Sequence, residues 1–157
     1  MQVLIVGDGP VTVALTEMVS VLGWSVTVSL TVPEIGADLD AVVVTSHHEG
    51  VDGPVIQAAL VAGTAYVGAM GSRRTQTRRR EWLTAAGVSS DALEALHAPI
   101  GLDIGADQPA EIAVSILAEI IGIRSGRLGE GSVASIGERD GAIHPELTPG
   151  EATCPGG

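Results

Sequence analysis

Short apolar runs alternate with stretches of helical periodicity along the first 124 residues. Residues 3–6 and 41–45 are nearly continuous apolar runs, which are typical of strands buried on both faces of a parallel sheet. Residues 25–30 and 65–69 predict two further strands, and residues 96–98 predict a weak fifth one. Glycine, histidine or proline follows each of these runs except 25–30, so we expect most of the strands to end in a turn.

Helices are predicted between the strands. From Val11 to Leu22 apolar residues recur at helical spacing, and Gly23 follows where a left-handed C-cap is expected. Pro109 and Glu111 suit the first turn of a helix, because proline lacks the amide hydrogen and an acid favours the positive end of the helix dipole. The remaining helices are predicted over residues 54–61, from the arginine cluster to about 86, in a short turn near 89–91, and over 109–123.

This alternation over about 120 residues implies βαβ units. We therefore predict an α/β fold, with a doubly wound, mostly parallel, Rossmann-like sheet in three α/β/α layers. A chain of 157 residues fits one such domain, here residues 1–124. Residues 125–157 are rich in Gly, Pro, Ser and Glu and predict an extended or disordered tail, although residues 132–136 could add an edge strand.

Composition and charge argue against several classes of partner and binding site. Asp and Glu number 19 against 8 Arg and Lys, and the net charge of −11 argues against a nucleic-acid partner. The single cysteine, Cys154, excludes an intramolecular disulfide and a cysteine-rich metal site, which is consistent with a reducing compartment. Because Met1 opens on a strand-like run and no apolar stretch reaches about 18 residues, we expect no signal peptide, no membrane span and a cytoplasmic location.

Ligands bind at the carboxyl ends of the strands in a doubly wound sheet, near the switch in strand order. The segments 7–10, 47–50, 68–74 and 99–105 should therefore converge on one crevice. The first of them reads Gly-Asp-Gly-Pro, a tight turn of the kind that binds a pyrophosphate. Three interpretations of this turn stay open: an NAD site, a purely structural turn, or a site for another phosphate-bearing ligand.

Five of the eight basic residues lie between residues 73 and 80, a local reversal of charge that suggests a bound anion. Backbone donors after Gly71, the Ser72 hydroxyl and the guanidinium groups of Arg73 and Arg74 could bind phosphate or a polar heterocycle. The other three arginines are expected on a solvated helix face: Arg78, Arg79 and Arg80.

Histidines supply the remaining polar candidates. His47 and His48 are adjacent, so in an extended segment they point to opposite sides and do not readily share a metal, but at least one could hydrogen-bond a ligand. His97 is either a ligand contact or a structural histidine. Spacing identifies no Ser-His-Asp or Cys-His arrangement, so we predict no catalytic residue and no metal ligand.

Two strings resemble the Rossmann domain of the XdhC/CoxI family, accessory proteins of molybdenum hydroxylases such as xanthine dehydrogenase and carbon monoxide dehydrogenase. They are YVGAMGSRR at 66–74 and HAPIGLDIGADQPAEIAVSILAEI at 97–120, within a similarity over about residues 3–124. The resemblance implies a nucleotide-binding fold and a chaperone, rather than an enzyme, that binds molybdenum cofactor as molybdopterin or its nucleotide form. The implied cofactor-binding residues are Gly7, Gly9, Pro10, His47, His48, Gly68, Gly71, Ser72, Arg73, Arg74, His97, Pro99 and Gly101.

The chain departs from that family in several places. Usual members have a separate N-terminal domain with a Gly-Cys-Val-Glu type motif, so we expect a separate subunit to supply it, or a homodimer. Cys154 is a poor substitute as a contact to molybdenum or sulfur. Thr12 stands where a small residue is common, and Gln108 replaces the usual Ser or Thr cap, which should cost about 1 kcal/mol.

The leading hypothesis is a factor that binds molybdenum cofactor and assists its maturation or its insertion into the apo-enzyme of a molybdenum hydroxylase. An NAD(P)-dependent oxidoreductase is the first alternative. Thr12 disfavours it, as does the lack of an acid beside Ser29 and Leu30 to bind the ribose. A ligand-free interaction module is the second alternative.

Overall fold

A computed structural model describes residues 1–128, and within them five parallel strands form one sheet in the order β2-β1-β3-β4-β5. The strands are β1 (Gln2–Val6), β2 (Ser25–Ser29), β3 (Ala41–Val44), β4 (Tyr66–Ala69) and β5 (Leu96–His97). The helices are α1 (Pro10–Val21), α2 (Glu49–Val61), α3 (Arg73–Ala85), α4 (Ser90–Glu94) and α5 (Pro109–Arg124). The predicted α/β fold with a parallel sheet is confirmed.

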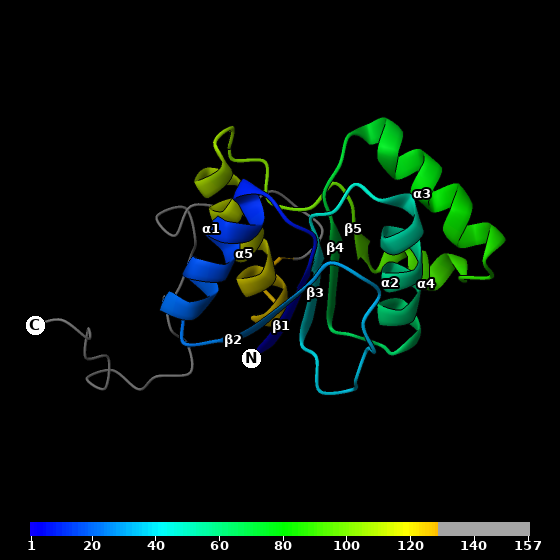
Figure 1. The fold of residues 1–157 in the computed structure, drawn as a ribbon, viewed down its shortest axis with the longest axis horizontal. Helices are drawn as coiled ribbons and strands as arrows, with labels where there is room; N and C mark the ends of the chain where they lie inside the picture. The colour runs from blue at the N-terminus through cyan, green and yellow to red at the C-terminus, as the bar shows by residue number, and fades with distance from the viewer. Residues whose placement is uncertain (129–157) are drawn as a thin grey trace, which may run out of the picture.

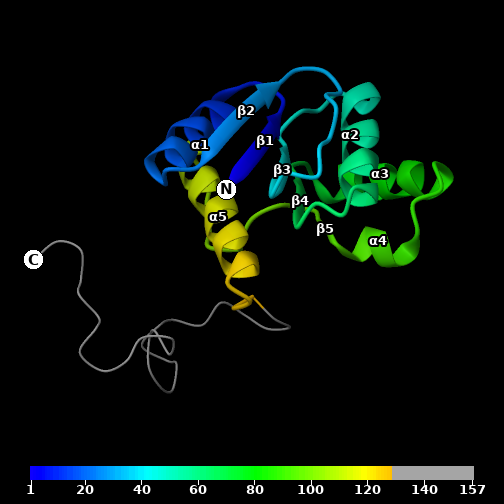
Figure 2. The same cartoon turned by 90° about the horizontal axis from the view of Figure 1, so that it is seen from below.

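Alternate residues of the central strands enter two separate cores. Val3 and Ile5 of β1 pack with α1 and α5, whereas Leu4 and Val6 pack with α2, α3 and α4. Figures 1 and 2 show these two groups of helices on opposite faces of the sheet. Burial on both faces explains why β1 and β3 read as continuous apolar runs.

The helix α2 begins earlier than the sequence pattern predicts. We expected a helix over residues 54–61 with proline at its start, but the helix begins at Glu49 and contains Pro54. The carbonyl of His48 accepts hydrogen bonds from the amides of Val51 and Asp52, which closes the first turn. The prediction was wrong because Pro54 does not mark the start of the helix. It lies in the second turn, where its missing amide hydrogen removes only the hydrogen bond to the carbonyl of residue 50.

The switch in strand order lies between β1 and β3. The chain leaves β1 toward β2 on one side and then returns to β3 on the other side of β1. Gly7 follows β1 and packs against the segment that follows β3: a Cβ on Gly7 would stand 2.5 Å from the backbone nitrogen of Ser46 and from the Thr45 hydroxyl. The first two loops are therefore in direct contact at the carboxyl edge of the sheet.

The division at residue 124 coincides with the end of α5 at Arg124. The possible edge strand at 132–136 and the predictions for Cys154 lie outside the described residues. Among residues 1–128, no helix combines the length and the apolar character that crossing a membrane requires.

Gly7 and Gly9 allow a direct test of the loop contact, since both have positive φ, +131° and +98°. Open space surrounds the Cβ position of Gly9, so Gly9→Ala should cost only the backbone strain of about 1 to 2 kcal/mol. Gly7→Ala adds a clash with Ser46 and should cost about 3 kcal/mol or more. Urea unfolding of both variants measures the difference, and equal losses would contradict the packing role of Gly7.

Candidate functional site

The loops that follow β1, β3, β4 and β5 lie at one edge of the sheet, because all strands run parallel. We expected the segments 7–10, 47–50, 68–74 and 99–105 to converge on one crevice at this edge. The cleft near this edge, however, lies between α2 and α3, and of the predicted ligand residues it includes only His47. Its volume is about 680 Å³, and it is lined by His47, Asp52, Gly53, Thr75, Arg78, Arg79, Glu81 and Trp82.

The first loop is built mainly for packing. Thr12 is buried, and its hydroxyl lies 2.7 Å from the hydroxyl of Thr45. Thr45 also donates to the carbonyl of Val6, so Thr12 helps to join α1, β1 and the end of β3. Gly9 and Pro10 are exposed at the start of α1, so this part of the loop is accessible to a ligand.

The two adjacent histidines have different positions. His47 is exposed and lines the cleft. His48 is the N-cap residue of α2, and its backbone amide donates to the Ser46 hydroxyl at 3.0 Å. In the part of the chain that the structure describes, no three His, Cys, Asp or Glu side chains come together as a possible metal site.

The loop after β4 presents two arginines at the start of α3. Gly71 has a φ of +132°, and Ser72 is the N-cap residue, whose hydroxyl accepts from the amide of Thr75. Arg73 and Arg74 are exposed in the first turn, which contains no acid. Positive charge at this end opposes the helix dipole, and a bound anion would offset that repulsion.

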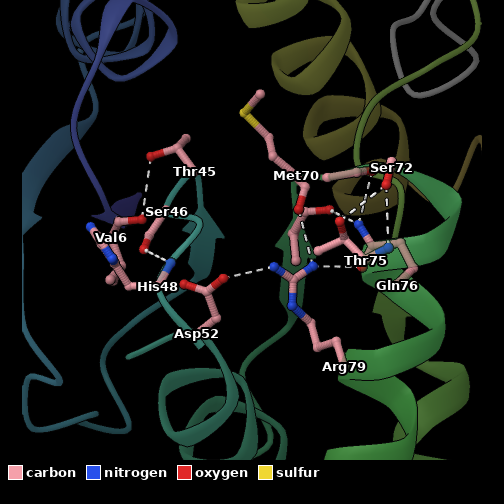
Figure 3. A network of polar contacts seen from close by, with 12 residues as sticks. Val6, Thr45, Ser46, His48, Asp52, Met70, Ser72, Thr75, Gln76 and Arg79 are labelled. Carbon is pink, nitrogen blue, oxygen red and sulfur yellow. Dashed lines mark hydrogen bonds and ion pairs between the residues drawn. The ribbon is translucent and has the colours of Figure 1, made fainter. Parts of the chain in front are cut away.

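Arg79 is not solvated, so the prediction of an exposed face for it was wrong. Only 6% of Arg79 is exposed, and Figure 3 shows its guanidinium reaching across to α2, where Nη2 donates to Asp52 Oδ2 at 2.9 Å. Its Nη1 donates to the carbonyl of Met70 and to Gln76 Oε1. Arg78 and Arg80 are exposed, as predicted.

Gln76 extends this network to the backbone of the loop. Its Nε2 donates to the carbonyls of Ala69 and Gly71 at 3.1 and 3.2 Å. The loop that leads into Arg73 and Arg74 at the start of α3 is therefore held by Arg79 and Gln76, although neither was predicted to belong to the site. Arg79 lies four residues before the buried Leu83, and this shared helical face was the available signal in the sequence.

Asp52 and Trp82 form two sides of the cleft. Asp52 is 4% exposed, and its Oδ1 has no hydrogen-bond donor among the described residues. Trp82 is 43% exposed and lies against Gly53, where a Cβ would stand 2.6 Å from the Trp82 ring. The small residue at position 53 thus lets the indole pack on the backbone of α2.

His97 belongs to a second network, centred on Glu119 of α5. The ring of His97 stacks on Tyr66 with centroids 4.8 Å apart, and its Nδ1 lies 3.5 Å from Glu119 Oε1. Tyr66 and the amide of Gly101 both donate to Glu119 Oε2. These contacts support the structural interpretation of His97 and show that Glu119 anchors the loop after β5.

Burial and the contacts within this network shift the pKa values of Glu119 and Tyr66 in opposite directions. Burial alone would raise the pKa of the Glu119 carboxyl, but the contacts with His97, Tyr66 and the Gly101 amide together lower that pKa below its ordinary value. Burial, followed by the charge of Glu119, raises the pKa of the Tyr66 phenol far above its usual range. Glu119 is therefore the charged acceptor and Tyr66 the neutral donor.

Gly68 in β4 and Gly101 in the loop after β5 allow close packing of neighbouring side chains. A Cβ on Gly68 would collide with Ile100, which follows the cis peptide bond between Ala98 and Pro99. Gly101 has a φ of +96°, and a Cβ there would stand 2.5 Å from the Ser115 hydroxyl. Pro99 is exposed. At the start of α5, Glu111 Oε2 accepts from the amides of Asp107 and Gln108, which is the bond that the acid supplies in a capping box.

Comparison with known proteins agrees with this fold. The family model described as the XdhC Rossmann domain matches residues 3–120. The molybdenum cofactor insertion chaperone PaoD of Escherichia coli (strain K12) is 37% identical over 84 residues, which are 54% of this chain and 26% of PaoD. A probable xanthine dehydrogenase subunit of Bacillus subtilis (strain 168) is 38% identical over 85 residues, which are 54% of this chain and 24% of that protein.

A crystal structure of a xanthine dehydrogenase from Bacillus halodurans superposes with a TM-score of 0.63 at 25% identity, over 84% of this chain and 45% of that chain. The uncharacterized protein YqeB of Escherichia coli (strain K12) is 40% identical over 65 residues, 41% of this chain and 12% of YqeB. The chain thus spans about a quarter or less of the curated relatives that it matches.

We expect Arg79→Leu to destabilise the fold by about 3 to 5 kcal/mol, because it leaves the Asp52 carboxylate buried without its cation. The double variant Asp52→Leu/Arg79→Leu should be less destabilised than Arg79→Leu, since it removes both charges. Arg80→Leu on the exposed face of the same helix is the control and should stay within about 0.5 kcal/mol. Urea unfolding checks all three, and a loss of under about 1 kcal/mol in Arg79→Leu would contradict the buried pair.

The lowered pKa of Glu119 predicts that the stability of the fold depends on pH in the acid range. A carboxyl whose pKa is lowered by folding stabilises the folded state above its unfolded value and loses that contribution as the pH falls through the folded value. The stability of the native chain should therefore fall as the pH drops below 4.5, the ordinary value, and Glu119→Gln should show a smaller fall. Thermal unfolding over the acid range compares them, and parallel curves would refute a charged Glu119 in the network.

Proposed function

Because the chain belongs to the XdhC family, whose Rossmann domain it matches over residues 3–120, we propose that it binds molybdenum cofactor. We propose further that it assists maturation of this cargo or its insertion into a molybdenum hydroxylase of the xanthine dehydrogenase or carbon monoxide dehydrogenase type. The relatives support a molybdenum-enzyme accessory role, since one is named a molybdenum cofactor insertion chaperone and another is named as part of a xanthine dehydrogenase.

The observation that carries the proposal is the arginine pair at the start of α3. Molybdenum cofactor carries a phosphate, or a diphosphate in its nucleotide form, and this group needs backbone donors and cations. Arg73 and Arg74 are exposed beside Gly71 at the carboxyl edge, against a helix dipole that disfavours them without an anion. The residues at this loop therefore fit the phosphate of the cargo.

The molybdenum end of the cargo has no comparable fit in the described chain. Cys154, the only cysteine of the sequence, lies outside residues 1–128. The chain would thus hold the cargo by its phosphate and leave the metal end to a partner. We propose that this partner is the apo-enzyme, a separate subunit with the N-terminal part of the family, or a second copy of the chain.

The alternative of an NAD(P)-dependent oxidoreductase gains no support from the loop after β2. Ser29 stands at the end of β2, and its hydroxyl donates to the carbonyl of Thr31. A ribose acceptor of the usual kind would be an acid at this place. Thr12 also occupies the position of the third glycine and is buried against Thr45.

Arg73→Ala and Arg74→Ala should each weaken binding of molybdopterin by about 1.5 to 3 kcal/mol, because each removes a charged hydrogen bond to the phosphate. Arg80→Ala is the matched control, since it removes the same exposed charge farther along the same helix. It should leave the affinity nearly unchanged. Calorimetric titration measures the three values.

Equal losses of affinity in all three variants would indicate only a non-specific electrostatic attraction and would contradict a phosphate site at the α3 start. The same titration with NADH should show no binding tighter than about 100 μM, which corresponds to roughly 5.5 kcal/mol. Micromolar NADH binding with hydride transfer would overturn the carrier function in favour of the oxidoreductase.

A further inference from the structure

The strand β2 forms an edge of the sheet that lacks the usual protection against pairing with another chain. Within residues 1–128 it pairs with β1 alone, and Figure 2 shows it beyond β1, on the side away from α2. The strand β5 at the opposite edge is only two residues long, whereas β2 has five residues. Proteins commonly protect a long edge strand with a charge, a proline or a bulge, and β2 contains none of these.

The chain around β2 is uncharged, and part of its surface is apolar. Residues 18–33 contain no acidic or basic side chain, although the whole chain has a net charge of −11. Val28 is 44% exposed and Leu30 is 63% exposed. Two copies of the chain can therefore meet at this edge without like charges opposed along the strand, and the contact would cover exposed apolar side chains.

The free backbone groups of this edge belong to Val26 and Val28. The amide of Ser25 and the carbonyl of Ser29 form hydrogen bonds on the β1 side of the strand. Because the backbone groups of successive residues in a strand point to opposite edges, those of Val26 and Val28 point outward. No strand of residues 1–128 lies on that side.

The sequence of β2, Ser-Val-Thr-Val-Ser, reads the same in both directions. If two such strands pair antiparallel about a twofold axis at Thr27, this threonine lies opposite its own copy and Val26 lies opposite Val28 of the second copy. Both valines direct their backbone groups outward, so they can exchange N–H···O bonds across the axis. The register that pairs like side chains, Thr with Thr and Val with Val, thus also satisfies the free backbone groups.

We propose that β2 pairs with β2 of a second copy of this chain, antiparallel and centred on Thr27, so that one sheet continues through a homodimer. A twofold contact brings the same surface of both copies together and therefore requires a self-complementary strand. Val26 packs with the core of α1 and α5, so the paired valines join the cores of the two copies on that face. The inference does not rest on cofactor binding, since none of the candidate cofactor contacts lies in β2.

Sedimentation velocity of the full 157-residue chain over a concentration series should show a dimer that dissociates on dilution. Thr27→Lys should be monomeric, because like charges directly opposite each other are destabilising, and Thr27→Glu should be monomeric for the same reason. An equimolar mixture of the two variants should restore the dimer, because each lysine then faces a glutamate. Thr84→Lys, at an exposed threonine of α3, is the matched control and should dimerise like the native chain.

Three results of this experiment would overturn the inference, with circular dichroism to verify the fold of each variant. The first is a native chain that stays monomeric up to about 100 μM, which would leave the edge to another occupant, such as residues 132–136 or a different protein. The second is a Thr27→Lys variant that still dimerises. The third is a mixture of the lysine and glutamate variants that stays monomeric.

Disulfide formation tests the register of the pairing. Cys154 is first replaced by serine, so that the only cysteine is the one introduced. Thr27→Cys in this background should form a covalent dimer under mild oxidation, because position 27 faces its own copy at a Cα separation of about 4.5 Å. Ser25→Cys is the matched control and should stay reduced, since it faces position 29 of the second copy. No cross-link in Thr27→Cys, or an equal one in Ser25→Cys, would overturn the inference.

Discussion

Burial of the central strands on both faces is the constraint on which the rest of this structure depends. Residues 3–6 and 41–44 are almost completely buried, so helices must cover both faces of the sheet, and each connection must return the chain to the same end before the next strand. All strands consequently run parallel, and the loops that follow β1, β3, β4 and β5 gather at one edge. The loops that carry the candidate ligand residues gather there because of this topology and not because of their spacing in the sequence.

A buried ion pair controls the geometry of that edge. Arg79 joins α2 to the loop after β4 through Asp52 and Met70, and Gln76 holds the same loop by two backbone carbonyls. A pair of this kind contributes modestly to net stability, because desolvation offsets much of the attraction, but loss of one partner is costly. Its structural consequence is a defined position for the start of α3, where Arg73 and Arg74 are exposed.

Two different groups of contacts hold the loops at this edge. Arg73 and Arg74 are exposed at the start of α3, where an anion would offset the repulsion between their charges and the helix dipole. The network of Tyr66, His97 and Glu119 has a different role, since Glu119 holds the amide of Gly101 and thereby the loop after β5. Of the residues that the family resemblance implied as cofactor contacts, Gly7, Gly68 and Gly101 have packing reasons of their own, whereas Gly9, His47, Arg73 and Arg74 remain open to a ligand.

The sequence by itself determined the fold class, the strands and the common edge, because apolar periodicity reports directly on which faces a strand or helix buries. It also located the glycine turns and the arginine pair at the start of α3, since these depend on neighbours in the chain. Only the tertiary structure decided the start of α2 at Glu49, the burial of Arg79 and the roles of Asp52, Trp82 and Glu119. The charged groups among these have partners far away in the sequence, such as Gly101 for Glu119 and Asp52 for Arg79. A local pattern carries no information about which distant group neutralises a charge or fills the space beside a glycine.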